Sequence, residues 1–341
     1  MRKRLIPAQA ILVLALLAVL AHPALGQSAN QLTACKDFAY STEEDFVTQG
    51  PEPADGDPVI SDGDLLNRFH TVCMRNADLV QVFDVRSDMG LDAVDVLDVD
   101  QQLVAFSTEL NSPFGNFTHG DLLTTLGAAI PNQALLLSFE LRNMDLGLDA
   151  VHFVGDQRNI AGLLDEARQI GRKQYLENPD RLVGQLRQWN VDIWFSTEGT
   201  APPVQQPQFL DGDLLSARDG IIVARNSTLL PASVPAGIPD RGVDFGLDAA
   251  TAPRNANRRE MRFSTSILYR GQPAFTDGDI LKFGNGVDIS DDDLYSPFEP
   301  RADFLGTDAL FMRFEEQPLP LWDRFLPLIL RQFRQLLGLE P

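Results

Sequence analysis

Short apolar runs bounded by glycine and aspartate recur along the whole chain. One kind of run leads into an aromatic residue followed by Ser-Thr and usually Glu, a second follows Asp-Gly-Asp, and a third follows Gly-Leu-Asp-Ala. Short apolar runs between turn residues predict β-strands. Further strands are expected at 79–83 and 134–139, in the gap before the third signature. Each unit of the pattern is therefore expected to hold about four short strands.

The three signatures return four times in the same order. Their copies begin at Tyr40, Phe106, Phe195 and Phe263, at Asp62, His119, Asp211 and Asp277, and at Gly90, Gly147, Gly246 and Gly306. Units of about four strands are typical of propeller blades, and strands from both chain ends must complete one blade to remove the open edges. The predicted fold class is all-β: a four-bladed β-propeller of four-stranded repeats, closed by both termini.

Two segments depart from this pattern. Residues 157–190 carry apolar positions at helical spacing in two runs separated by Asn178-Pro179, which predicts a helical hairpin inserted within one unit. Residues 317–341 are apolar but interrupted by arginines, which predicts an amphipathic C-terminal helix rather than a membrane span. The four-repeat domain is expected to occupy 27–316.

The first 26 residues are typical of a cleaved secretory signal peptide. A basic start, Met1 to Arg4, precedes an apolar run from Ile11 to Leu20 and small residues up to Gly26. That run is too short to cross a bilayer, so no transmembrane span is expected. The mature chain is therefore predicted to be secreted or otherwise extracytoplasmic.

Composition adds an acidic surface and one disulfide. Lys and Arg total 28 against 48 Asp and Glu, a formal net charge of −20. Such a charge disfavours nucleic acid and favours cations or basic partners, although it also serves solubility alone. Cys35 and Cys73 are the two cysteines, and in an oxidising compartment they predict one disulfide bond. The protein is expected to be a monomer.

The repeated acids are the candidate site residues. In the third signature they are Asp92, Asp149, Asp248 and Asp308, and each is expected to begin an otherwise apolar strand face. A carboxylate so placed must be hydrogen-bonded, paired or metal-bound. One reading is that each accepts backbone N–H bonds of the adjacent turn, and the other is that the four surround a calcium ion.

The acids of the second signature carry the same two readings. They are Asp62, Asp64, Asp121, Asp211, Asp213, Asp277 and Asp279. They can cap a tight turn around the glycine, or supply oxygens to a bound calcium ion together with Asp55 and Asp57.

No catalytic residue can be assigned from the sequence. Ser107 and Ser196 are expected to cap or pair at strand ends, because no Gly-x-Ser-x-Gly motif is present. A single active site requires one unit to depart from the repeat. His119, His152 and the inserted helices all fall in or beside the second unit, which is therefore the place to look for one.

Two resemblances accompany these motifs. The Asp-Ala pairs at 92–93, 149–150, 248–249 and 308–309 are similar to those of hemopexin-type four-bladed propellers. That resemblance implies that Asp-Ala begins the innermost strand and that carbonyls around the axis can hold calcium. The full set of three signatures resembles repeats in uncharacterised exported bacterial proteins, over nearly the whole mature chain, and implies no activity.

Three functions remain open at this point. The first is a secreted, non-enzymatic module that binds a protein, glycan or surface polymer, with calcium as a stabilising ion. The second is a secreted hydrolase that uses acidic residues, with or without a metal. The third is a structural component of the cell envelope.

Overall fold

A computed structural model describes residues 32–203, 207–302 and 304–314. The predicted signal peptide and the predicted C-terminal helix both lie outside these residues. Every strand and helix given below belongs to the repeat region.

Four antiparallel sheets of four strands each make up most of the fold, and each corresponds to one unit of the repeat. In sheet order they are β18 (Thr307–Met312), β1 (Phe38–Thr42), β4 (Leu65–Asn67) and β5 (Thr71–Met74); β6 (Val94–Asp98), β7 (Leu103–Phe106), β8 (Leu122–Thr124) and β9 (Ala129–Ile130); β10 (Val151–Val154), β11 (Asp192–Phe195), β12 (Leu214–Ser216) and β13 (Ile221–Ala224); and β14 (Ala250–Thr251), β15 (Arg262–Phe263), β16 (Ile280–Lys282) and β17 (Val287–Ile289). We name the sheets I to IV in that order.

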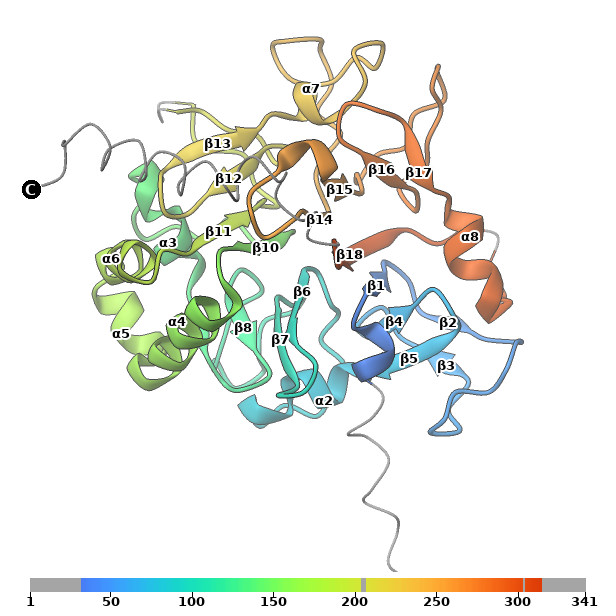
Figure 1. Cartoon of the computed structure of the whole chain (residues 1–341), viewed down its shortest axis with the longest axis horizontal. Coiled ribbons are helices and arrows are strands. Elements are labelled where there is room, and N and C mark those ends of the chain that lie inside the picture. The colour runs from blue at the N-terminus through green and yellow to red at the C-terminus, as the bar shows by residue number, and fades with distance from the viewer. Residues whose placement is uncertain (1–31, 204–206, 303, 315–341) are drawn as a thin grey trace, which may run out of the picture.

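The four sheets surround the middle of the molecule, with the strands β18, β6, β10 and β14, which follow or include the Asp-Ala pairs, innermost (Figure 1). Neighbouring inner strands contact one another in the order β18, β6, β10, β14 and back to β18. Sheet I joins the two ends of the described chain, because β18 pairs with β1 and Leu310 lies opposite Tyr40. The starts of all four inner strands thereby come close together.

The prediction of an all-β, closed four-bladed propeller is wrong. The described residues form five separate small sheets, the fifth being the pair β2 (Phe46–Val47) and β3 (Val59–Ile60), and none of the five is closed. Helices also form a substantial part of the fold. The strands are two to six residues long, and their ladders stay within each sheet. Apolar side chains, scattered polar contacts and isolated backbone bonds, such as that from the Gly155 amide to the Arg254 carbonyl at 3.0 Å, join one sheet to the next.

The strands predicted at 79–83 and 134–139 are also wrong. The first segment belongs to α2 (Asn76–Val80) and η3 (Gln81–Phe83), and the second to α3 (Asn132–Leu135) and η4 (Leu136–Phe139). Short apolar runs do not distinguish a strand from a short buried helix by periodicity. The same place after the fourth strand holds α7 (Asn226–Leu229) in sheet III, and α8 (Asp291–Tyr295) with η6 (Ser296–Phe298) in sheet IV.

The inserted segment is helical, as predicted, but has three helices instead of two. They are α4 (Gln157–Ile170), α5 (Arg172–Glu177) and α6 (Asp180–Trp189), on the outer side of the second and third sheets (Figure 1). Their apolar faces, which include Leu163, Tyr175 and Leu186, pack into the largest core cluster. Among the described helices, none is both long and apolar enough to traverse a bilayer.

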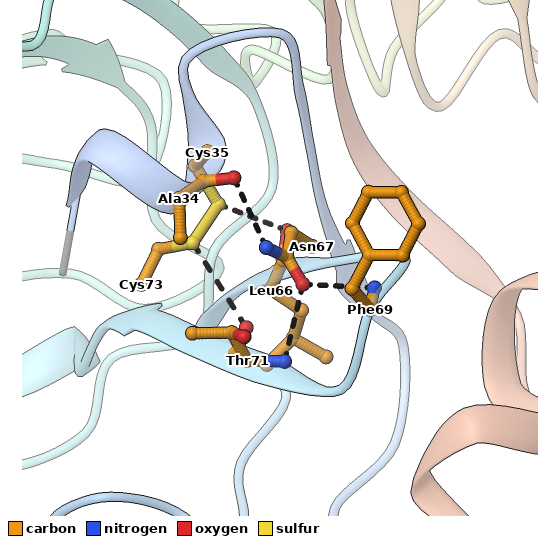
Figure 2. Close-up of a disulfide and its surroundings, with 7 residues drawn as sticks. All are labelled: Ala34, Cys35, Leu66, Asn67, Phe69, Thr71 and Cys73. Atoms are coloured by element: carbon orange, nitrogen blue, oxygen red, sulfur yellow. Dashed lines mark hydrogen bonds between the residues drawn. A yellow bond between two sulfur atoms is a disulfide. The ribbon is translucent and has the colours of Figure 1, made fainter.

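The predicted disulfide is present between Cys35 and Cys73. Cys35 ends the short helix η2 (Leu32–Cys35), and Cys73 lies in β5, the outer strand of sheet I (Figure 2). The Asn67 side chain donates to the Ala34 carbonyl at 3.0 Å beside it. The bond therefore ties the beginning of the described chain to the outer edge of the first sheet.

The serine of the first signature links neighbouring sheets. Ser41, Ser107 and Ser196 each donate from Oγ to the carbonyl of the leucine in the next unit's Gly-Leu-Asp-Ala, at 2.7 to 2.9 Å. The threonine that follows bonds within its own turn, because Thr108 Oγ1 donates to the carbonyl two residues ahead, at 3.0 Å. Both roles are structural, which agrees with the prediction that these serines cap or pair.

Candidate cation-binding site

The four aspartates of the third signature converge at the starts of the inner strands. Asp92, Asp149, Asp248 and Asp308 are each 5 to 8 % exposed. Asp92, Asp149 and Asp308 are each close enough to other members of the set for the neighbouring carboxylate charges to raise their pKa. The sequence predicted the residues, and the arrangement of the sheets brings them to one place.

Three glutamates of the first signature lie beside them. The side chains of Glu109, Glu198 and Glu43 cover the glycines of the third signature in their own sheets, at Gly90, Gly147 and Gly306. A Cβ at any of these glycines would collide with the glutamate, and Gly90 and Gly147 also adopt φ values of +69° and +76°. We call the seven residues the central acidic cluster: Asp92, Asp149, Asp248, Asp308, Glu43, Glu109 and Glu198.

Burial and mutual repulsion keep Asp92, Asp149, Asp308, Glu43 and Glu109 from ionising readily. Burial, followed by the charges of Glu198 and Glu109, raises the pKa of Asp92 well above its usual range. Burial and the other carboxylates raise the pKa of Asp149 and of Asp308 in the same direction. The pKa of Glu109 rises to about 7 and that of Glu43 to about 8, with burial again the largest cause. The cluster therefore holds protons near neutral pH unless another cation replaces them.

Two buried oxygens of the cluster lack a hydrogen-bond partner among the described residues. They are Oδ2 of Asp92 and Oδ2 of Asp248. The other oxygen of Asp248 accepts a hydrogen bond from Ser266, which stands where the first three units have glutamate. Burial raises the pKa of Asp248 to about 7. A buried carboxylate oxygen without a hydrogen bond destabilises the fold, so hydrogen bonds from a cationic donor to these two oxygens would stabilise it most.

The described side chains fit a directly coordinated metal ion poorly. In the residues that the structure describes, no three His, Cys, Asp or Glu side chains are placed to hold one ion together. Calcium takes six to eight oxygen ligands, so it would need waters or backbone carbonyls in addition to these carboxylates. The calcium prediction therefore stays a prediction, and its test is given below.

The Asp-Gly-Asp acids divide into two groups with different roles. The first acid of the signature, at Asp62, Asp211 and Asp277, extends the acidic surface outward from the cluster. Asp211 adds to the charge around Asp149, and Asp277 to that around Glu43. Burial, followed by the charge of Asp88, raises the pKa of Asp62 to about 6.

The second acid of the signature is structural. Asp64, Asp213 and Asp279 accept backbone N–H bonds at 2.9 to 3.0 Å from the first residue of the following short helix, and Asp121 accepts the Thr118 amide at 3.2 Å. Arginines neutralise three of these acids: Arg75 pairs with Asp64, Arg172 with Asp121 and Arg225 with Asp213. Arg75 also pairs with Asp55, so Asp55 and Asp64 share one cationic partner.

An asparagine that the sequence analysis missed holds each turn in place. The Asn76 side chain donates to the carbonyls of Gly63 and Gly90, and its Oδ1 accepts the Met89 amide at 2.9 Å. Asn226 makes the three equivalent bonds in sheet III, and Asn132 in sheet II donates to the Gly147 carbonyl and accepts the Leu146 amide. The signal was available, since an Asn follows the fourth strand in the first three units and Asp291 replaces it in the last.

The two histidines in or beside the second unit, His119 in sheet II and His152 in sheet III, contact different acids. His119 Nδ1 lies 2.7 Å from Glu198 Oε1, so this histidine reaches the cluster from the neighbouring sheet. His152 is buried in β10, and its Nδ1 lies 3.5 Å from Asp95 Oδ2. They do not form one site, because the second pair lies three residues further along the inner strands.

Asp95 and Arg254 form an ion pair that the sequence analysis did not single out. Arg254 follows β14 and donates to both carboxylate oxygens of Asp95, at 2.5 and 2.6 Å, and to the Phe153 carbonyl at 2.7 Å. Despite the burial of Asp95, the charge of Arg254 and the His152 bond lower its pKa. This pair connects sheets II, III and IV.

We expect folding stability to fall as the pH rises from about 5 to 8. Carboxyls of the cluster have folded pKa values above their unfolded values near 4, so the native state binds more protons in this window and the free energy of unfolding decreases with pH. A fall of roughly 5 °C in the thermal midpoint, about 2 kcal/mol, is expected in the absence of added cations.

Replacing Asp92 and Asp248 together by Asn should raise the midpoint at pH 8 and change it little at pH 5. Asp100→Asn, in the turn between β6 and β7 at the far end of the inner strand, is the control and should leave the pH profile unchanged. A wild-type midpoint that is flat or rising over pH 5–8, measured by calorimetry, would contradict this account.

No family model, curated protein or solved structure matches the chain. The two resemblances drawn from the sequence therefore stay predictions, and the function has to be argued from the site itself.

Proposed function

We propose that the mature chain is an exported, non-enzymatic binding module that takes up a cationic ligand at the central acidic cluster. One observation carries the proposal: equivalent carboxyls from four sheets meet at one place, and two of their buried oxygens, on Asp92 and Asp248, have no donor within the described residues. The signal-peptide pattern of residues 1–26 and the disulfide support a location outside the cytoplasm.

The arrangement couples cation binding to proton release. Near neutral pH several carboxyls of the cluster hold protons, and a bound cation favours the ionised form. Binding should therefore be tighter at pH 8 than at pH 5. Protons should leave as the cation enters, and a calorimetric titration in two buffers of different ionisation enthalpy measures them.

The first test compares thermal unfolding at pH 8 in buffer, with calcium, with magnesium and with methylammonium. A cation at about 100 times its dissociation constant stabilises the folded state by about 2.7 kcal/mol, a midpoint rise of roughly 5 °C or more. The variant with Asn at 92 and 248 should lose this rise, and Asp100→Asn should keep it.

Calcium has its own comparison within that test. If it stabilises the fold, as the sequence predicted, then a chelator should lower the midpoint of protein purified in calcium. Equal midpoints in calcium and in chelator would end the calcium prediction. No rise at pH 8 with any of these cations, or with hexylammonium, would end the proposed function.

The hydrolase alternative has one observation in its favour. Glu43 and Glu109, with pKa values of about 8 and 7, carry a proton near neutral pH, as a general acid must. Its test is a panel of chromogenic glycoside and ester substrates, with Glu43→Gln and Glu109→Gln as variants. Turnover that both variants abolish would replace the binding proposal by this one.

A further inference from the structure

The two unpartnered oxygens of the cluster lie on sheets that are not neighbours. Asp92 precedes β6 of sheet II and Asp248 precedes β14 of sheet IV, while sheets I and III lie between them in the order of inner-strand contacts. Neither oxygen has a hydrogen-bond partner of the usual donor types among the described residues, although the Asp92 carboxyl also lies within hydrogen-bond reach of the Asp149 carboxyl. A single small group with several N–H donors could therefore satisfy both.

Exposed apolar side chains stand next to the cluster on the same two sheets. Leu110 follows Glu109 and is 55 % exposed, and Ile267 follows Ser266 and is 47 % exposed. Backbone bonds fix both positions, because the Leu110 amide donates to the Met89 carbonyl at 3.0 Å and the Ile267 amide to the Phe245 carbonyl at 3.2 Å. Met89 and Phe245 each precede the glycine of the third signature, so the backbones of Leu110 and Ile267 lie beside the turns that lead to Asp92 and Asp248.

The corresponding residue of sheet III is not apolar. Gly199 takes this place, with its amide bonded to the Leu146 carbonyl at 2.9 Å. The apolar border is therefore on the same sheets as the unpartnered oxygens. A partner that has an apolar stem behind a donor-rich cation would contact both features at once, whereas a bare ion would contact only the acids.

We propose that the ligand carries a primary alkylammonium group, whose N–H donors bind Asp92 and Asp248 while its apolar stem packs on Leu110 and Ile267. This proposal deepens the proposed function and rests on it. The absence of three convergent metal ligands among the described side chains agrees with an organic cation. A lysine side chain of a polypeptide and a free alkylamine share this chemistry.

The experiment is a titration of the full mature chain at pH 8, followed by calorimetry or by the amide NMR spectrum. The probes are hexylammonium, methylammonium, hexyltrimethylammonium, calcium and blocked lysine amide. We expect hexylammonium to bind at least about tenfold more tightly than methylammonium, because several methylenes leave water. Hexyltrimethylammonium should bind much more weakly than hexylammonium, since it keeps the charge and stem but has no N–H donor.

Two double variants test separately the contribution of the ammonium group and that of the alkyl chain. Asn at both 92 and 248 should abolish hexylammonium binding. Serine at both 110 and 267 should remove the preference for hexylammonium over methylammonium while methylammonium still binds. Phe69→Ser is the matched control, because Phe69 is 64 % exposed in sheet I away from the cluster, and it should change neither affinity.

The outcomes distinguish this inference from the proposed function. If calcium or methylammonium binds as tightly as hexylammonium, the alkylammonium inference is overturned and cation binding stands. If no probe binds, both fall. Blocked lysine amide that binds like hexylammonium would extend the inference to polypeptide lysines, and binding by hexylammonium alone would confine it to free amines.

Discussion

Replacing Arg254 by Met is expected to lower the thermal midpoint by roughly 10 °C at pH 8. Asp95 is 1 % exposed, and Arg254 is the cation that pairs with both of its oxygens. The methionine would keep much of the arginine stem's packing but leave the carboxylate buried without its charge partner. Breaking a buried pair from one side costs about 3–5 kcal/mol, and about 2–4 °C accompanies each kcal/mol in a domain of this size.

Two further variants test whether the buried charge causes that fall in the midpoint. Adding Asp95→Asn to Arg254→Met removes the buried charge and should recover part of the midpoint. Arg142→Met is the control, because Arg142 and Asp180 are 60 % and 70 % exposed and such surface pairs contribute under about 1 kcal/mol. A loss no larger than in the control would show that the pair does not hold the sheets together.

His152 gives the same variant a pH dependence. Burial lowers the pKa of His152, and the charge of Arg254 lowers it further, although Asp95 acts in the opposite direction. Without Arg254 the histidine can accept a proton more readily and partly compensate Asp95. The deficit of the variant relative to the wild type should therefore be smaller at pH 5 than at pH 8.

Removing the disulfide is expected to have the second-largest effect. The bond closes a loop of 38 residues between Cys35 and Cys73. Constraining a loop of this length in the unfolded chain contributes about 4 kcal/mol, so replacing both cysteines by Ala should lower the midpoint by roughly 10 °C. The disulfide also keeps the short helix η2 on the outer edge of sheet I (Figure 2).

Reduction supplies the control for that experiment. Dithiothreitol should lower the midpoint of the wild type toward that of the double variant and leave the double variant unchanged. Equal midpoints for oxidised wild type and double variant would refute the stabilising role. Recovery of free Cys35 in a non-reducing peptide map would refute the bond itself.

Much of the local structure could be read from the sequence because its cause is local. The Ser-Thr and Asp-Gly-Asp signatures place a strand before or after a turn, and the structure has those strands at β1, β4 and their counterparts in the other sheets. The helices of 157–190 follow from apolar spacing in the same way. The short helices at 76–83 and 132–139 could not be recognised, because four or five apolar residues fit either a strand or a helical turn.

The four aspartates of the candidate site were predicted, but its three glutamates and its environment were not. The repeated aspartates could be named because they recur beside Ala in every unit. Their surroundings come from other parts of the chain, since Ser266 lies 18 residues from Asp248. The same holds for Asp95, an acid outside that set, whose partner Arg254 lies 159 residues away. One sequence offers no measure of such distances. The division of the Asp-Gly-Asp acids into an outward group and a structural group also depended on which backbone amides each acid meets.

The sequence by itself determined the number of units, the strands that the three signatures define, the cysteine pair and the acids available for chemistry, since each of these depends on residues close together or on composition. Only the tertiary structure decided that the sheets stay separate, that helices share the core, and that Asp92 and Asp248 keep an oxygen without a donor. Those features arise where sheets meet, because burial and charge there depend on side chains from different units.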